Sequence, residues 1–194
     1  ERNARGEREE MKDQMIYAEK LSRMVQCETI SVPDVPNTEK FDKFHKLLEE
    51  LFPLVFSKGE VHYIDSSLLI RWKGKGKAEP ILLMSHQDVV PAEGEWKYPP
   101  FSGEIKEDRI WGRGTVDTKG SLMCIFQSIE ELMEERYIPE GDVYIASSST
   151  EEVAGSGAPK TVEWLKEHNV RLQFLMDEGG MFVVGIALEK SHDV

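Results

Sequence analysis

Residues 80–120 read PILLMSHQDVVPAEGEWKYPPFSGEIKEDRIWGRGTVDTKG, and this stretch decides the fold expected of the chain. Its apolar run, Ile81–Met84, is bounded by a proline on one side and by polar residues on the other. A run this short is typical of a buried strand rather than a helix. In α/β folds, ligands bind just beyond the carboxyl ends of such strands, so the polar residues that follow are candidates for a site.

Two residues directly after this strand, His86 and Asp88, point to metal binding. They are two positions apart, so in an extended segment their side chains lie on the same side. Asp88 can then approach one imidazole nitrogen of His86 and leave the other free for a metal. Farther along, Asp117 lies in a glycine-rich loop at the entrance to a helix that starts near Lys119. The sequence therefore predicts a metal site whose other ligands come from elsewhere in the chain.

Two more predicted strands end in carboxylates. The strand Asp142–Ser147 leads to Glu151 and Glu152, and the strand Val170–Met176 leads to Asp177. One imidazole among several carboxylates suits zinc, with cobalt or manganese as substitutes. Two metals about 3.5–4 Å apart would need a carboxylate that bridges them. Of two adjacent glutamates, one can bind metal while the other takes a proton from water.

Each of these groups also has an ordinary structural explanation. His86 can be a polar residue at a strand end, and Asp117 can serve only as the cap of its helix. Glu151-Glu152 can be a solvated acidic turn, and residues 177–180 a simple turn. The residue patterns by themselves therefore give a metal hydrolase as one interpretation among others.

The remaining elements predict an α/β fold, a three-layer domain with a central mixed sheet and helices on both faces. Apolar residues at helical spacing predict helices from Met11 to about Gln26, from Asn37 or Thr38 to Phe52, from Lys119 to before Pro139, and through Trp164 to about His168. Alternation and turn residues predict strands at Val61–Ile64, Leu68–Trp72 and Phe182–Leu188, and a hairpin of Glu104–Lys106 with Arg109–Trp111.

The composition of the 194 residues fits one ordinary domain or a large piece of one, with 40% hydrophobic and 31% charged residues. The formal charge of −12 argues against a nucleic-acid partner, which needs a basic surface. No apolar run is long enough to cross a bilayer, which argues against a membrane partner, and no secretory signal is visible, which favours the cytoplasm. We expect Cys27 and Cys124 to be small buried residues, and His45 and His62 to serve packing rather than ligation.

Four segments together resemble the active-site motifs of a known family. They read SHQDVVPAEGEWKYPPFSG, IWGRGTVDTKG, STEEVAGSG and LMDEGG, and they run in order from about Ile81 to Gly180. They resemble the aminoacylase/carboxypeptidase family of di-zinc peptidases and amidohydrolases, and most of all its carboxypeptidase S and N-acyl amino acid amidohydrolase branch. The match is specific because four motifs agree at the expected separations.

The resemblance implies a role for each candidate residue. His86 becomes a ligand of one zinc, and Asp88 the carboxylate that orients it. Asp117 becomes the ligand that bridges two zincs, with a cis peptide after it. The rest of the implied set is Glu151 as the general base, Glu152 as a ligand of the second zinc, and Asp177 as the second protein ligand of the first zinc.

The chain also departs from the family's pattern. The family is roughly twice as long, and it adds a lid domain that mediates dimerisation and a late histidine for the second zinc. We therefore expect residues 1–194 to be the N-terminal portion of a catalytic domain whose full-length parent is a homodimer. His168 and His192 are the remaining candidates for the late ligand, and a solvent-facing position is the expectation for His168.

The resemblance implies zinc-dependent hydrolysis of an amide bond next to a free carboxylate, in a dipeptide or an N-acyl amino acid. On its own, this part of the chain is expected to hold one metal well and to turn over weakly or not at all. The alternative is a truncated or non-catalytic remnant that binds metal without turnover. A deacetylase with the same metal core shares the chemistry, and a ligase is a further alternative.

Overall fold

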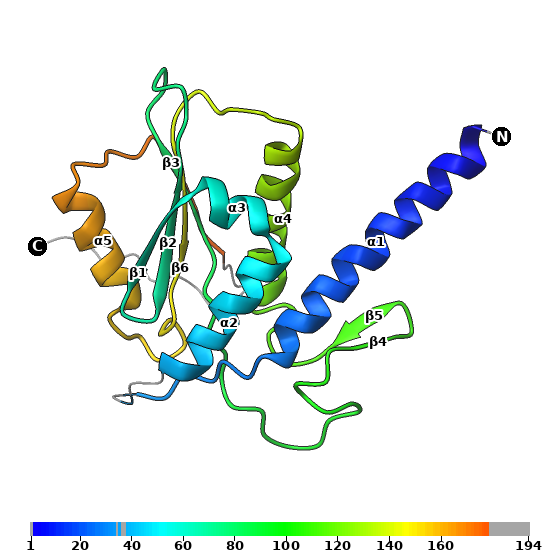
Figure 1. Ribbon diagram of the computed structural model, residues 1–194. Coiled ribbons are helices and arrows are strands. Elements are labelled where there is room, and N and C mark those ends of the chain that lie inside the picture. Colours follow the sequence, from blue (N-terminus) through cyan, green and yellow to red (C-terminus); the bar gives the residue numbers. More distant parts are fainter. Residues whose placement is uncertain (1, 34, 36–37, 179–194) are drawn as a thin grey trace, which may run out of the picture.

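A computed structural model describes residues 2–33, 35 and 38–178 of the chain (Figure 1). The helices are α1 (Arg2–Gln26), α2 (Thr38–Leu51), α3 (Pro53–Lys58), α4 (Lys119–Glu134) and α5 (Gly157–Glu167). The strands are β1 (Glu60–Ile64), β2 (Ser67–Trp72), β3 (Ile81–Met84), β4 (Glu104–Lys106), β5 (Arg109–Trp111), β6 (Val143–Ser147) and β7 (Phe174–Met176).

Five strands form a mixed sheet in the order β1-β2-β6-β3-β7. β2 is antiparallel to both of its neighbours, β1 and β6, whereas β6, β3 and β7 run parallel. A separate hairpin pairs β4 with β5 and turns at Glu107 and Asp108, both of which have positive φ. The predicted mixed sheet and the predicted hairpin are confirmed.

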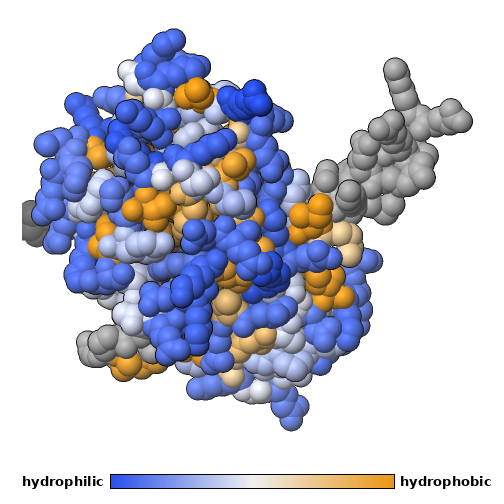
Figure 2. Space-filling view, in the orientation of Figure 1, coloured by the Kyte–Doolittle hydropathy of each residue, from blue (hydrophilic) through white to orange (hydrophobic). Residues whose placement is uncertain are grey.

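Helices cover both faces of this sheet, as predicted, and alternation along the strands sorts the core into two clusters (Figure 1). On one face, side chains such as Ile70 and Ile145 pack against α1 to α4. On the other face, Leu69 and Leu82 pack with Leu165 of α5. The domain therefore has three layers. Figure 2 shows that the surface seen from the same side is mostly hydrophilic, in keeping with the charged composition.

The short helix α3 is absent from the sequence-based prediction. Pro53 stands in its first turn, where a proline costs no backbone hydrogen bond. The carboxylate of Glu130 on α4 accepts hydrogen bonds from Leu54 N and Val55 N, both at 2.9 Å. A six-residue helix is too short to show periodicity, and this long-range cap stabilises it.

Three other expectations differ from the structure. The predicted strand Val170–Met176 shortens to β7, because Val170 N bonds to Leu165 O and completes the end of α5 after Asn169 at a positive φ of 53°. Cys124 is exposed rather than buried, since it lies on the part of α4 that faces a shallow apolar groove. Cys27 is half-buried, and the predicted strand Phe182–Leu188 lies outside the described residues.

Among the helices that the structure describes, none has the length and apolarity needed to span a membrane.

Candidate metal centre

The predicted site residues follow three parallel strands that end at the same edge of the sheet. β6, β3 and β7 are neighbours, so the segments after them lie side by side. His86 and Asp88 follow β3, Glu151 and Glu152 follow β6, and Asp177 and Glu178 follow β7. The carboxyl edge of a parallel sheet is where α/β proteins bind ligands.

His86 is buried, with only 2% of its side chain exposed, and its two ring nitrogens have different surroundings. Nδ1 lies 2.9 Å from the backbone oxygen of Asp88. A carbonyl oxygen only accepts hydrogen bonds, so Nδ1 carries a hydrogen, while Nε2 faces the carboxylate of Asp117. One nitrogen is thus held by a backbone carbonyl, and the other faces carboxylates, where a bound metal would take the place of its proton.

Three carboxylates surround Nε2 of His86. From His86 Nε2, the distances are 2.9 Å to Asp117 Oδ1, 3.5 Å to Glu178 Oε1 and 3.6 Å to Glu151 Oε2. Single ligand atoms of His86, Asp117 and Glu178 all lie within 4.8 Å of one another. The side chains of Asp117 and Glu151 are 66% and 51% exposed, so a solute can reach this cluster from solvent.

The electrostatics of the cluster favour a bound cation. Burial by itself lowers the pKa of His86, but its contacts with Asp88 and Asp117 more than compensate and raise it to about 9. Burial, together with the negative charge of Asp117, raises the pKa of Glu152 and of Glu178. The carboxylates around the imidazole repel one another, and a divalent metal bound among them would offset this repulsion.

Asp88 connects His86 to the segment that carries the two glutamates. Its carboxylate is fully buried and accepts hydrogen bonds from Glu151 N and Glu152 N, both at 3.1 Å. The same carboxylate lies 3.3 Å from His86 Nδ1. Asp88 therefore fixes the position of both glutamates relative to the imidazole, in addition to orienting the ring.

The loop before α4 presents Asp117 to the cluster. Gly114 has a positive φ of 87°, and a Cβ there would lie 2.8 Å from a methyl group of Val89, so only glycine fits. Ser85 Oγ donates to Thr118 O at 3.1 Å and ties the loop to the end of β3. The Asp117–Thr118 peptide is cis, as the resemblance implied.

Lys119 anchors the start of α4 from inside the core. It is fully buried, and its ammonium donates to Met24 O and Cys27 O at the carboxyl end of α1 and lies 5.1 Å from the ring centroid of Phe44. The helix dipole and the aromatic face both favour a cation at this place. Burial lowers the pKa of Lys119 to about 8.

A buried polar layer supports the loop that carries His86. Gln87 Nε2 donates to Ser66 O and Ser147 O, so its Oε1 is left to accept a hydrogen bond from His45 Nε2 at 2.8 Å. Burial lowers the pKa of His45. This histidine serves core packing, as expected, but its partner Gln87 carried no signal in the sequence because the two residues are 42 positions apart.

The structure places the other candidates as follows. Glu178, which the sequence did not single out, joins His86 and Asp117, whereas Asp177 is exposed and its Oδ1 accepts a hydrogen bond from Glu178 N at 2.9 Å. Glu152 lies near enough to Asp117 that the negative charge of Asp117 helps to raise the pKa of Glu152. His168 is exposed and stacks on Trp164 at 3.7 Å between ring centroids, and His192 lies outside the described residues.

Comparison with known proteins gives this geometry its context. Residues 82–189, more than half of the chain, match the profile of the peptidase family M20/M25/M40. The chain belongs to this family. The matched range covers all three strand ends of the candidate centre, and the expected resemblance is confirmed.

In the aligned regions, about a third of the residues are identical between this M20 chain and its curated relatives. It is 36% identical to a probable carboxypeptidase S-like protein of Dictyostelium discoideum, over 84% of this chain and 33% of the relative. It is 34% identical to the human N-fatty-acyl-amino acid synthase/hydrolase PM20D1, over 88% of this chain and 35% of the relative. Carboxypeptidase S of Saccharomyces cerevisiae is 32% identical, over 83% and 31%. The M20 chain thus spans about a third of the length of these relatives.

Solved structures confirm the fold. An M20 family metallo-carboxypeptidase from Sulfolobus solfataricus superposes with a TM-score of 0.70 at 23% identity, over 84% of this chain and 37% of the other. Human carnosine dipeptidase 1 superposes with a TM-score of 0.68 at 16% identity, over 87% and 40%. The predicted α/β architecture is therefore that of M20 metallopeptidase catalytic domains.

Proposed function

We propose that the protein is a zinc-dependent hydrolase of an amide or peptide bond next to a free carboxylate. The observation that carries this proposal is the pairing of Glu151 with the metal-ligand cluster, since Glu151 Oε2 lies 3.6 Å from His86 Nε2. A protein that only binds metal has no use for a carboxylate base at this position. Names of the relatives, carboxypeptidase S and N-fatty-acyl-amino acid synthase/hydrolase, support a dipeptide or an N-acyl amino acid as substrate.

The residues present fit a metal cofactor. His86, Asp117 and Glu178 would hold the first zinc, because each offers one ligand atom within 4.8 Å of the others. Asp117, shared with the first zinc, and Glu152 would hold a second zinc. Cobalt and manganese accept similar donor sets and are proposed as substitutes. When bound, zinc supplies a Lewis acid for the scissile carbonyl.

The chain's own residues would then divide the chemistry of hydrolysis. Asp88 keeps the hydrogen of His86 on Nδ1, so Nε2 stays a ligand. The Glu151 carboxylate takes a proton from water, whose oxygen bonds to the acyl carbon, and passes that proton to the leaving nitrogen. The exposed side chains of Asp117 and Glu151 leave room for a substrate beside them.

The proposal also covers the domain organisation, dimerisation and location of the full-length protein. We propose that residues 1–194 form the N-terminal portion of the catalytic domain. The full-length protein would add a lid and a further histidine for the second zinc, and it would dimerise through that lid. Its place of action would be the cytoplasm.

Replacing Glu151 by Gln tests the function. We expect zinc content per chain to stay the same and hydrolysis of N-acyl amino acids to fall by about 10²–10⁴-fold, the usual contribution of a general base. The matched control is Glu163→Gln on the exposed side of α5, which removes the same charge far from the cluster. Zinc is measured by atomic emission and turnover by release of the free amino acid.

Two outcomes would contradict the proposal. A Glu151→Gln protein that hydrolyses as fast as the Glu163→Gln control would show that Glu151 is not the base. A wild-type protein that binds zinc but hydrolyses neither dipeptides nor N-acyl amino acids would support the alternative, a remnant that binds metal without turnover.

A further inference from the structure

Gln87 lies between His86 and Asp88 in the chain, and its side chain points away from the candidate metal centre. Side chains alternate along an extended segment, so Gln87 projects from the face opposite to its two neighbours. The residue is fully buried. A buried amide has to find its hydrogen-bond partners inside the protein, so the partners of Gln87 identify what holds this segment from behind.

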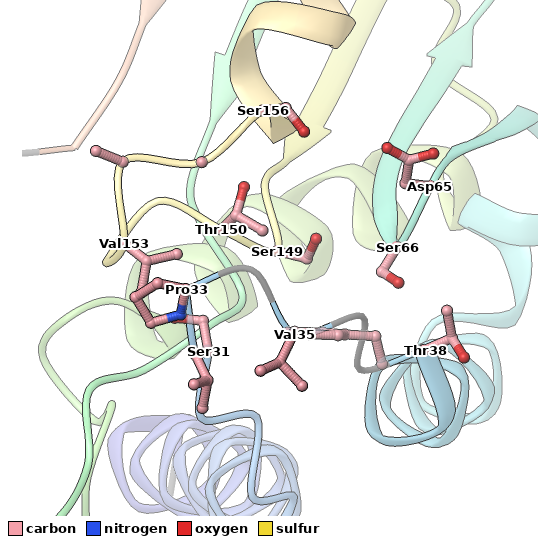
Figure 3. Close-up of a pocket in the computed structure, with 14 residues that line it drawn as sticks. Ser31, Pro33, Val35, Thr38, Asp65, Ser66, Ser149, Thr150, Val153 and Ser156 are labelled. Atoms are coloured by element: carbon pink, nitrogen blue, oxygen red, sulfur yellow. The ribbon is translucent and has the colours of Figure 1, made fainter.

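The amide of Gln87 is completely satisfied, and it joins three elements. Its Nε2 carries two hydrogens and donates to Ser66 O at 2.9 Å and to Ser147 O at 3.1 Å. Ser66 belongs to the turn between β1 and β2, and Figure 3 shows it across from Ser149, which follows β6. Oε1 of the same amide accepts a hydrogen bond from His45 Nε2 of α2 at 2.8 Å. One side chain therefore connects the β1–β2 turn, the end of β6 and α2.

His45 makes this contact as a hydrogen-bond donor. Both hydrogens of the Gln87 amide face backbone oxygens, which only accept, so its Oε1 is left as the acceptor for His45. Burial lowers the pKa of His45, which favours a neutral ring with its hydrogen on Nε2. The ring also packs against Tyr63 of β1, with 5.3 Å between the ring centroids. Its orientation is therefore fixed by both a hydrogen bond and an aromatic contact.

The side chain of Gln87 restrains a movement that the backbone contacts leave open. Gln87 N donates to Ser148 O at 2.9 Å, and Thr29 Oγ1 donates to Gln87 O at 2.6 Å. Backbone groups of an extended segment point sideways, so these bonds fix where the segment runs within the sheet. A rotation of the segment about its own axis would still carry His86 and Asp88 away from the carboxylates. The bonds of Gln87 on the opposite face oppose that rotation.

We propose that Gln87 and His45 are positioning residues, which hold His86 and Asp88 in the direction that the metal centre requires. The inference deepens the proposed function and rests on it where hydrolysis is concerned. Among the residues that the structure describes, the side chain of Gln87 bonds to His45 and to backbone oxygens rather than to the metal-ligand cluster. Both residues would therefore act through the backbone of residues 86–88.

Three variants test the pair, and a fourth is the control. Gln87→Met keeps a long unbranched side chain and removes all three hydrogen bonds. His45→Phe keeps an aromatic ring and removes the donor to Gln87. His45→Gln is the conservative variant, since its amide N–H can replace the imidazole N–H. The control for lost stability is Glu130→Gln, which removes a buried acceptor from α3 and lies outside the cluster.

Zinc affinity is the first readout. We expect it to fall about tenfold or more in Gln87→Met, about three- to tenfold in His45→Phe, and to stay within about twofold of the wild type in His45→Gln and Glu130→Gln. The absorption bands of the cobalt-loaded protein report ligand geometry, and they should shift in Gln87→Met and His45→Phe alone. At saturating zinc, these two variants should lose kcat for an N-acyl amino acid while KM stays within about twofold.

A further readout needs no metal. Glu151 N and Glu152 N donate to the carboxylate of Asp88, so hydrogen exchange at these two amides reports whether Asp88 is in place. Exchange should be faster in Gln87→Met and His45→Phe than in the Glu130→Gln control, under conditions where every variant is folded by circular dichroism. His45→Gln should exchange like the wild type.

The outcomes separate this assignment from the proposed function. Gln87→Met and His45→Phe proteins that lose thermal stability, yet match the Glu130→Gln control in zinc affinity, cobalt bands and amide exchange, would overturn it. So would a His45→Gln protein as impaired as His45→Phe. If Gln87→Met does not fold, the two His45 variants decide. If the wild type binds zinc but hydrolyses no amide, the proposed function fails and the order of zinc affinities still decides the positioning role. If it binds no zinc, exchange at the two glutamate amides decides.

Discussion

Asp88→Asn is the perturbation that most directly tests how the site is held together. The fully buried carboxylate accepts one hydrogen bond at each oxygen, from Glu151 N and from Glu152 N. An asparagine of the same shape keeps one acceptor and turns an NH₂ group toward the other backbone N–H. The variant therefore loses one hydrogen bond to a charged group and leaves one buried donor facing another donor.

The size of the effect follows from these contacts. A hydrogen bond to a charged group contributes about 1.5–3 kcal/mol, and each 1.4 kcal/mol corresponds to a tenfold change. If the whole loss falls on the position of the glutamates, kcat/KM drops by roughly 10–150-fold. Zinc affinity should also fall, by about 10–100-fold, because the same carboxylate orients His86.

The assay compares zinc affinity, by competition with a chelator, with kcat/KM for one N-acyl amino acid. Asp108→Asn, in the exposed turn between β4 and β5, removes the same charge and should change neither quantity. The reasoning is refuted if Asp88→Asn stays folded, by circular dichroism, and keeps both quantities within about twofold of the wild type. In that case the hydrogen bonds that Glu151 N and Glu152 N donate to Asp88 would contribute neither to zinc binding nor to hydrolysis.

Three further predictions address the metal ligands and the core. Glu178→Gln should weaken zinc binding at least about tenfold and Asp177→Asn less than about threefold, and the reverse order in the same titration would restore Asp177 as the ligand. The pKa of Lys119 is about 8 rather than the ordinary 10.5, so the unfolded chain binds more protons between these values and stability rises with pH. Urea unfolding of the wild type should therefore gain about 2 kcal/mol from about pH 7.5 to 9.5, a rise that Lys119→Met should lack. Glu130→Gln should lower the free energy of unfolding by about 1–3 kcal/mol, because one backbone N–H of α3 loses its acceptor, and an unchanged urea midpoint would contradict this role.

The elements that the sequence predicted best are those whose signal is local. β3 has the predicted bounds, and α4 begins at Lys119 as expected, because a proline-bounded apolar run and a repeating apolar face each identify one element. The hairpin of β4 and β5 also has its predicted bounds. Elements that depend on distant contacts were missed, and α3 is the clearest case, since Glu130 on another helix satisfies its first backbone groups.

The same distinction applies to the candidate site. The spacing of His86 and Asp88 gave the orientation of the imidazole, a contact between residues two positions apart. The role of Asp88 as acceptor for Glu151 N and Glu152 N spans more than 60 positions, so no local pattern could indicate it. Exposure of Cys124 depends in the same way on which element covers that part of α4, and the sequence of the helix does not contain this information.

The difference between Asp177 and Glu178 shows what the register of the sheet adds. Met176 pairs with Leu83 of β3 and lines the same groove as Ile125 of α4, so Met176 faces α4. Side chains alternate along an extended segment, which turns Glu178 toward the side where α4 begins, just after Asp117. The Asp177 carboxylate instead accepts a hydrogen bond from its backbone neighbour, Glu178 N. The sequence singled out Asp177 alone, because the choice between the two carboxylates requires knowing which face of that strand α4 covers.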